Sequence, residues 1–178
     1  KAFALQPLAK GNRIGIVSMT GAGCVMAADY SAEYDLEVAE LSDETEKYIE
    51  SYLPSWIKVK NPFDSEMLFE SVGPEDCLKI SLGGMLEDKN VDCAICVLPS
   101  SPMFAFDVKG SVKEIKEKYP DKPFTMNFIG SKDMVDLWTK QLEYMSVPVY
   151  PSIERCVRAL GALSKHPNVA RALVSDSE

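Results

Sequence analysis

Residues 13–29 read Arg13-Ile-Gly-Ile-Val-Ser-Met-Thr-Gly-Ala-Gly-Cys-Val-Met-Ala-Ala-Asp29, an apolar run followed by a glycine turn and a second periodic segment. The apolar run Arg13 to Met19 predicts a buried β-strand, and the segment Cys24 to Tyr34 predicts a helix directly after the turn. A strand, a tight glycine turn and a helix in this order are typical of the first unit of a parallel α/β sheet.

The same alternation of short apolar runs and longer amphipathic segments continues along the chain. Further strands are predicted at 36–41, 91–98, 123–129 and 147–150, and further helices at 43–52, 75–87, 112–119, 132–145 and 153–166. Three prolines, Pro54, Pro62 and Pro74, predict a long loop between the second and third helices, and long loops are often functional. The pattern predicts an α/β fold, a flavodoxin-like three-layer sandwich with a mainly parallel five-stranded sheet.

Length and composition limit the class of protein. The 178 residues fit one domain, which we expect at residues 11–168, with a linker from a preceding domain at 1–10 and a C-terminal tail at 169–178. A net charge of -8 argues against a nucleic-acid partner, and no apolar run approaches the roughly 20 residues of a membrane span. Five cysteines, an odd number, favour reduced thiols, so we expect a soluble, cytoplasmic protein.

The glycine turn is the first candidate site. Thr20, Gly21, Ala22, Gly23 and Cys24 would place free backbone N–H groups and the positive end of a helix dipole where a phosphate or another anion can bind.

Two other interpretations of this turn stay open. A dinucleotide site needs Gly or Ala where Met26 stands, and Met26 is expected to crowd the helix against the strand, although Glu40 follows the second strand where a ribose-binding acid could lie. No phosphate-binding loop of the Lys-Ser/Thr type follows the glycines. The turn could also be purely structural.

The predicted strand 91–98 ends in Leu98-Pro-Ser-Ser-Pro102. Ser100 and Ser101 are candidate substrate-binding residues, since their hydroxyls could bond a phosphate or carboxylate near the point where strand order reverses. A Ser/Pro loop selected for turn chemistry is the alternative.

The sequence offers no evident acid–base residue. The single histidine, His166, is expected as a surface residue at the end of the last helix, which argues against a Ser-His-acid set, and no cluster indicates a metal site. Cys93 and Cys96 have C-x-x-C spacing but lie in a buried strand on opposite faces, which favours core packing over redox or zinc chemistry. Glu66 and Glu70 are expected to be solvated.

Several spaced motifs together resemble a known family. They are residues 10–29, residues 33–45, Tyr52-Leu-Pro54 with Val59-Lys-Asn-Pro-Phe-Asp64, Asn90-Val-Asp92, and Val147 to Leu160. In this order they resemble the third flavodoxin-like domain of the NDP-forming acyl-CoA synthetases, a family that includes ADP-forming acetyl-CoA synthetase and succinyl-CoA synthetase. The resemblance extends from about Pro7 to His166.

This resemblance implies a domain of an enzyme that interconverts acyl-CoA, NDP and phosphate with acid, CoA and NTP through a phosphohistidine. In the family the histidine belongs to the preceding flavodoxin-like domain, the CoA site to the first domain, and the nucleotide site to an ATP-grasp module. The partners implied are therefore these domains, within one protein or a complex. CoA, NDP or NTP and Mg are implied for the full enzyme and no cofactor for this domain.

The resemblance also implies roles for individual residues. Thr20 to Cys24 would hold the phosphohistidine, Ser100 and Ser101 would line the opposite wall, and no residue of this chain would be catalytic. The isolated domain would be inactive. The alternatives are a noncatalytic regulatory or assembly module of an acyltransferase-type fusion and a dinucleotide-binding domain.

Overall fold

A computed structural model describes residues 1–102 and 106–165 of the chain. The sheet has five strands in the order β2-β1-β4-β5, with β3 also paired to β1, and every strand pair is parallel. The strands are β1 (Arg13–Ser18), β2 (Glu37–Val38), β3 (Phe63–Asp64), β4 (Cys93–Ser100) and β5 (Phe124–Gly130). The predicted α/β fold with a mainly parallel five-stranded sheet is confirmed.

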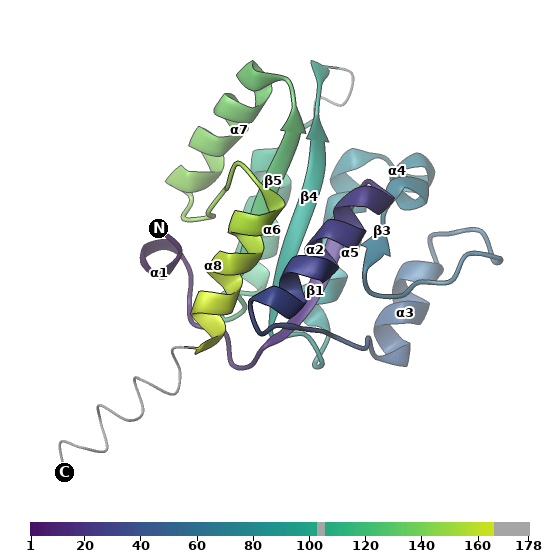
Figure 1. Cartoon of the computed structure of the whole chain (residues 1–178). Coiled ribbons are helices and arrows are strands. Elements are labelled where there is room, and N and C mark those ends of the chain that lie inside the picture. Colours follow the sequence, from purple (N-terminus) through teal and green to yellow (C-terminus); the bar gives the residue numbers. More distant parts are fainter. Residues whose placement is uncertain (103–105, 166–178) are drawn as a thin grey trace, which may run out of the picture.

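Helices cover both faces of the sheet, so the domain has three layers (Figure 1). α2 and α8 pack on one face, and α5 and α6 on the other. The helices are α1 (Ala2–Leu5), α2 (Gly21–Glu33), α3 (Asp43–Glu50), α4 (Glu66–Val72), α5 (Pro74–Glu87), α6 (Val108–Lys118), α7 (Lys132–Tyr144) and α8 (Ile153–Lys165).

The C-x-x-C pair belongs to the core, as predicted. Cys93 lies in the cluster between the sheet and α2 and α8, whereas Cys96 lies in the cluster on the opposite face, and both side chains are fully buried. Burial raises the pKa of both thiols. Within the described residues, no group of three or more His, Cys, Asp or Glu could hold a metal ion.

The fifth strand is not the one that the sequence predicted. Residues 147–150 contribute only one isolated bridge, between Val149 and Met126. The strand is instead β3, which lies with α4 inside the segment 54–74 that was predicted as a long loop. Two paired residues between prolines carry too little periodicity to indicate a strand.

Asn61 holds β3 in place. Two short strands pair with β1 along one edge, β2 beside Arg13 and Ile14 and β3 beside Val17 and Ser18, which leaves a gap between them. The amide of Asn61 fills this gap. Its Oδ1 accepts the N–H of Ile16 at 2.9 Å, and its Nδ2 donates to the carbonyl oxygens of Ile14 at 2.8 Å and Ala39 at 2.9 Å.

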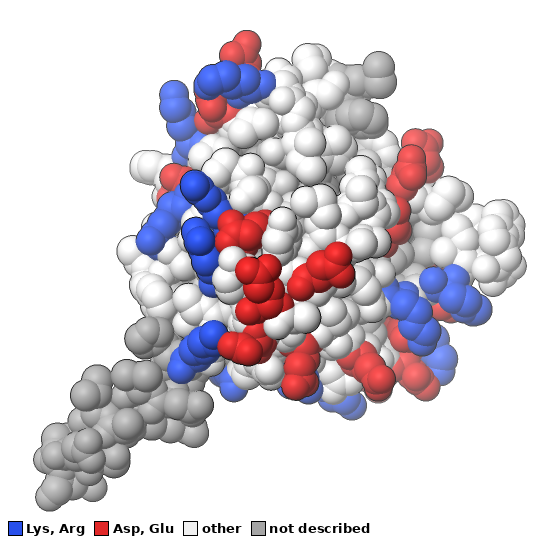
Figure 2. All heavy atoms as spheres, in the orientation of Figure 1, with Lys and Arg blue, Asp and Glu red and all other residues white. Residues whose placement is uncertain are grey.

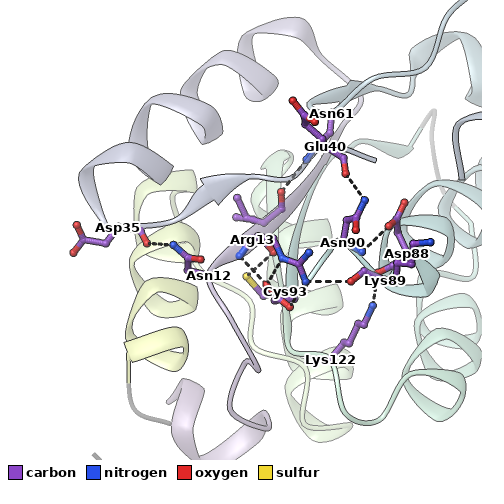
Figure 3. A network of polar contacts seen from close by, with 12 residues as sticks. Asn12, Arg13, Asp35, Glu40, Asn61, Asp88, Lys89, Asn90, Cys93 and Lys122 are labelled. Carbon is purple, nitrogen blue, oxygen red and sulfur yellow. Dashed lines mark hydrogen bonds and ion pairs between the residues drawn. The ribbon is translucent and has the colours of Figure 1, made fainter. Parts of the chain in front are cut away.

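An ionic network joins the amino ends of β1 and β4 (Figure 3). Arg13 donates from Nε to Asp92 Oδ2 at 2.8 Å and from Nη2 to Asp92 Oδ1 at 3.0 Å, and Lys122 donates to the carbonyl of Asp88 at 2.6 Å. Burial alone would raise the pKa of Asp92, but the hydrogen bonds and charge of Arg13 outweigh burial, so this pKa is lowered.

Residues 1–10 contact the domain. Ala2, Gln6 and Ala9 are buried, and the Gln6 side chain accepts the N–H of Phe124 at 2.9 Å and donates to the carbonyl of Ser146 at 2.7 Å. A connection to a preceding domain stays a prediction. The predicted tail at 169–178 and His166 lie outside the described residues.

Replacing the amide that fills the strand gap tests its structural role. We expect Asn61→Ala to lower the free energy of unfolding by about 2–4 kcal/mol, because three backbone groups lose their partner. Urea titration of the isolated chain measures this loss, and the amide of Ile16 should exchange faster with solvent. Asn12→Ala removes one exposed bond to the carbonyl of Asp35 and serves as the control; an equal loss in both variants would refute the role.

The lowered pKa of Asp92 predicts a pH dependence of stability. The folded value lies below the unfolded value of about 3.9, so the carboxylate stabilises the fold above about pH 4, and the effect is lost as pH falls through the folded pKa. Asp92→Asn should therefore cost about 2 kcal/mol at pH 7 and progressively less below pH 4 in urea titrations. Asp121→Asn, whose carboxyl is 78% exposed, should change little at either pH; a pH-independent loss in Asp92→Asn would contradict the expectation.

Candidate functional site

The strand order places the candidate site at the carboxyl ends of β1 and β4. The chain leaves β1 toward β2 and β3 on one side, whereas β4 and β5 lie on the other side, so strand order reverses between β1 and β4. In open α/β sheets this reversal opens a crevice that ligands use. The glycine turn begins there, directly after β1.

Local hydrogen bonds shape the turn. Thr20 caps α2, and its Oγ1 accepts the N–H of Gly23 at 3.1 Å. The hydroxyl of Ser18 donates to the Thr20 carbonyl at 2.9 Å and accepts the Thr20 N–H at 3.1 Å. Thr20, Gly21 and Ala22 are exposed, whereas Gly23 and Cys24 are buried. The predicted residues therefore form one continuous turn with its open side toward solvent.

Gly23 has no room for a side chain. A Cβ at this position would lie 2.3 Å from the Ser18 hydroxyl oxygen, so glycine allows α2 to start close against β1. The sequence interpretation assigned this close packing to position 26. Met26 is 45% exposed, whereas Ala27 is fully buried, so the expectation that Met26 crowds the helix was wrong.

Two backbone donors of the turn are available. Among the described residues, none accepts a hydrogen bond from the N–H groups of Gly21 and Ala22, which belong to the first turn of a 13-residue helix. These donors and the helix dipole together favour a negatively charged ligand.

Asp64 is a site residue that the sequence interpretation missed. It ends β3 beside the turn, and its Oδ2 lies 3.5 Å from where a Cβ of Gly21 would stand, while its Oδ1 accepts the N–H of Glu66. Its carboxylate thus flanks the open donors and opposes a second anion there. The motif Asn61-Pro-Phe-Asp64 was the sequence feature from which Asp64 could have been predicted as a site residue.

The Cys24 side chain is buried at the start of α2. Burial raises the pKa of its thiol to about 11, and the carboxylate of Asp64 adds to the effect. The thiol is therefore protonated at neutral pH.

The structure places Ser100 apart from the glycine turn. Ser18 pairs with Val97, so β4 continues three residues, or roughly 10 Å, beyond β1. By strand alternation Ser100 shares the face of Cys96 and Leu98, opposite α2. Its buried hydroxyl has no partner among the described residues, and Ser101 follows it at the end of the strand, partly buried.

Ser100 instead contacts the end of β5. Gly130 has φ +146°, and a Cβ there would lie 2.2 Å from the Ser100 carbonyl oxygen, which also accepts the N–H of Ser131. This close approach requires glycine. A role of Ser100 and Ser101 in binding substrate stays a prediction.

Glu40 also lies away from the turn. Its carbonyl accepts a hydrogen bond from Asn90, which precedes β4, so Glu40 lies toward the amino end of that strand (Figure 3). This position does not match an acid that binds the ribose of a dinucleotide beside the glycine turn.

None of the helices in the described ranges has the length and apolar character required to cross a membrane.

Comparisons with known proteins identify relatives over nearly the whole chain. Acetate–CoA ligase (ADP-forming) II of Archaeoglobus fulgidus is 33% identical over 93% of this chain and 24% of its own length. The alpha subunit of acetate–CoA ligase (ADP-forming) II of Pyrococcus furiosus is 32% identical over 92% of this chain and 35% of its own length. The chain therefore spans about a quarter to a third of these relatives. No protein-family model matches it.

Solved structures agree with the fold. A protein of Pyrococcus horikoshii OT3 superimposes with a TM-score of 0.79 at 26% identity, over 94% of this chain and 38% of that protein. A dinucleotide-forming acetyl-coenzyme A synthetase of Candidatus Korarchaeum cryptofilum, solved with phosphate and ADP, superimposes with a TM-score of 0.81 at 20% identity, over 99% of this chain and 37% of that protein. The chain is homologous to one part of the ADP-forming acetate–CoA ligases, members of the NDP-forming acyl-CoA synthetase family.

Proposed function

We propose that this chain is the part of an NDP-forming acyl-CoA synthetase that holds a phosphorylated histidine supplied by another domain. The enzyme would interconvert acyl-CoA, NDP and phosphate with acid, CoA and NTP. The observation that carries the proposal is the exposed start of α2, where the N–H groups of Gly21 and Ala22 point to no acceptor among the described residues. The other domains would bind CoA, the nucleotide and Mg²⁺.

The chemistry of the turn suits a transient anion. Backbone N–H groups stabilise a phosphoryl dianion without a basic side chain, so they do not trap the group before its onward transfer. Thr20 fixes the turn through Gly23, which keeps the donors in place before the ligand arrives. The site supplies binding and orientation, and the reacting groups would come from the partner domain.

Asp64 would keep the site free for this partner. Its carboxylate lies near the same donors, so it weakens the binding of free phosphate, which has no further contacts to the domain. A phosphohistidine on a docked domain would gain additional contacts and overcome this repulsion. The geometry thus favours a phosphoryl group presented by a protein over inorganic phosphate.

A charge placed on the open turn tests the function. Ala22 is exposed in the first turn of α2, where Asp is compatible with the helix. In the complete enzyme, Ala22→Asp should lower both the level of phosphohistidine and turnover by roughly 10- to 100-fold, because like charges about 5 Å apart cost roughly 1–3 kcal/mol.

Ala22→Asn is the matched control, since it has the same size and no charge. It should retain most of the activity, and both variants should unfold at a temperature close to that of the natural chain. Normal phosphohistidine and turnover in Ala22→Asp would overturn the proposed function.

The role of Asp64 has its own measurement. Inorganic phosphate added to the isolated chain should shift the amide resonances of Gly21 and Ala22 only at millimolar concentration, and Asp64→Asn should bind phosphate severalfold more tightly. Asp29→Asn, an exposed change further along α2, should leave the affinity unchanged. An unchanged affinity in Asp64→Asn would show that this carboxylate does not oppose the anion.

A further inference from the structure

A cleft of about 610 Å³ is lined by residues of α3, α5 and α6. α5 packs against both of the other helices, and its residues Gly83 and Gly84 are buried at the bottom of the cleft. The lining also includes Asp88 and Lys89, which precede β4, so the cleft lies toward the amino ends of the strands, away from the glycine turn. Its volume is typical of a site for a small molecule.

Gly83 is a glycine that packing does not require. A Cβ at Gly84 would lie 3.3 Å from Cδ1 of Ile49, so glycine at this position lets α3 approach α5 closely. A Cβ at Gly83 would meet, among the described residues, only Cε2 of Tyr119 at the ordinary contact distance of 3.8 Å. Because glycine inside a helix lowers its stability, Gly83 has a cost that contacts within the domain do not explain. The effect of this glycine is to deepen the cleft.

Two tyrosine rings flank the glycine pair. Tyr119, which ends α6, faces Gly83, while Cδ1 of Tyr48 on α3 lies 3.7 Å from the Cβ position of Gly84. Tyr48 is held edge to face by Tyr52 with ring centroids 5.5 Å apart, and Lys118 Nζ lies 4.9 Å from the centroid of the Tyr119 ring. Burial raises the pKa of both phenols, so they are uncharged at neutral pH. Aromatic walls beside a glycine floor suit a flat aromatic ring.

The charges along the α5–α6 side of the cleft are paired. Lys79 on α5 binds Glu114 on α6 at 2.7 Å. Glu87 on α5 accepts Lys118 on α6 at 3.3 Å. Positions 79, 83 and 87 share one face of α5, so the two ion pairs stand about 12 Å apart with Gly83 between them. Figure 2 shows a similar mixture of lysine and acidic side chains over α3. This balance favours an uncharged ring over a polyanion or a polycation.

Glu44 supplies a hydrogen-bond acceptor in the lining of the cleft. It lies in the first turn of α3, and its carboxylate has no partner among the described residues. A carboxylate accepts hydrogen bonds and cannot donate them, so it pairs with an amino group on a heteroaromatic ring. Among flat rings, this acceptor favours one that carries an exocyclic amino group.

We propose that the cleft binds the adenine base of a nucleoside. The ring lies over Gly83 between Tyr48 and Tyr119, and its amino group donates to the Glu44 carboxylate. The site lies away from the glycine turn and does not depend on the proposed function.

Titration of this chain with adenosine tests the site. The amide resonances of Gly83 and Gly84 should shift and saturate at a concentration of about 1 mM or below. Inosine, which has a carbonyl oxygen in place of the amino group, should bind about fivefold or more weakly. In Glu44→Gln the side chain can donate as well as accept, so the preference for adenosine over inosine should be lost. Glu70→Gln, an exposed change on α4, is the control and should keep the preference.

Filling the floor of the cleft gives a second measurement. A leucine at position 83 has room in the cleft and favours the helix, so Gly83→Leu should unfold at a temperature no lower than the natural chain. It should nevertheless weaken adenosine binding at least about tenfold. If this variant does not fold, the comparison of adenosine with inosine in Glu44→Gln decides alone.

Three results would overturn the adenine site: no saturable shift at Gly83 and Gly84, equal affinity of the natural chain for adenosine and inosine, or unchanged binding in a folded Gly83→Leu variant. Ala22→Asp should bind adenosine as the natural chain does. Adenosine affinity and the level of phosphohistidine therefore report separately on this site and on the proposed function.

Discussion

One side-chain amide completes the edge of the central strand. β1 pairs on one side with β4 along most of its length, but on the other side it meets two strands of two residues each, separated by a gap. Asn61 supplies both a donor and an acceptor at this gap and so replaces a stretch of backbone. Because buried N–H and C=O groups require partners, the segment that follows Asn61 is fixed beside the carboxyl end of β1. The position of Asp64 at the glycine turn depends on this constraint.

The sequence predicted the parts of the fold that depend on local patterns. The run Arg13 to Met19 and the turn that follows gave β1 and α2 to within a few residues, and the alternation of Cys93 and Cys96 placed them on opposite faces. It did not predict β3, because two residues form that strand and the gap beside it is filled by a side chain rather than by a ladder. Hydrophobic periodicity contains no information on such a bond.

The candidate site shows the same division. A glycine turn before a helix was sufficient to predict open backbone donors at Gly21 and Ala22. The spacing of the glycines, however, led to the wrong prediction that position 26 packs against β1. Gly23 lies against the Ser18 hydroxyl, whereas Met26 is half exposed, and only the rotation of α2 relative to β1 decides between them. Likewise, Ser100 follows a strand that borders the site, yet β4 extends past β1, which separates Ser100 from the turn. The spacing of motifs along the chain does not indicate how far one strand extends beyond its neighbour, so it could not predict this separation.

The segment between α3 and α4 ends beside the glycine turn. Asn61 and Asp64 both lie in this segment, three residues apart. Because Asn61 is bonded to backbone groups of Ile14, Ile16 and Ala39, the end of the segment is held beside the carboxyl end of β1. Thr20 holds the start of α2 through the N–H of Gly23. Under the proposed function, phosphoryl binding at Gly21 and Ala22 therefore depends on where the partner domain is held and not on a conformational change within this domain.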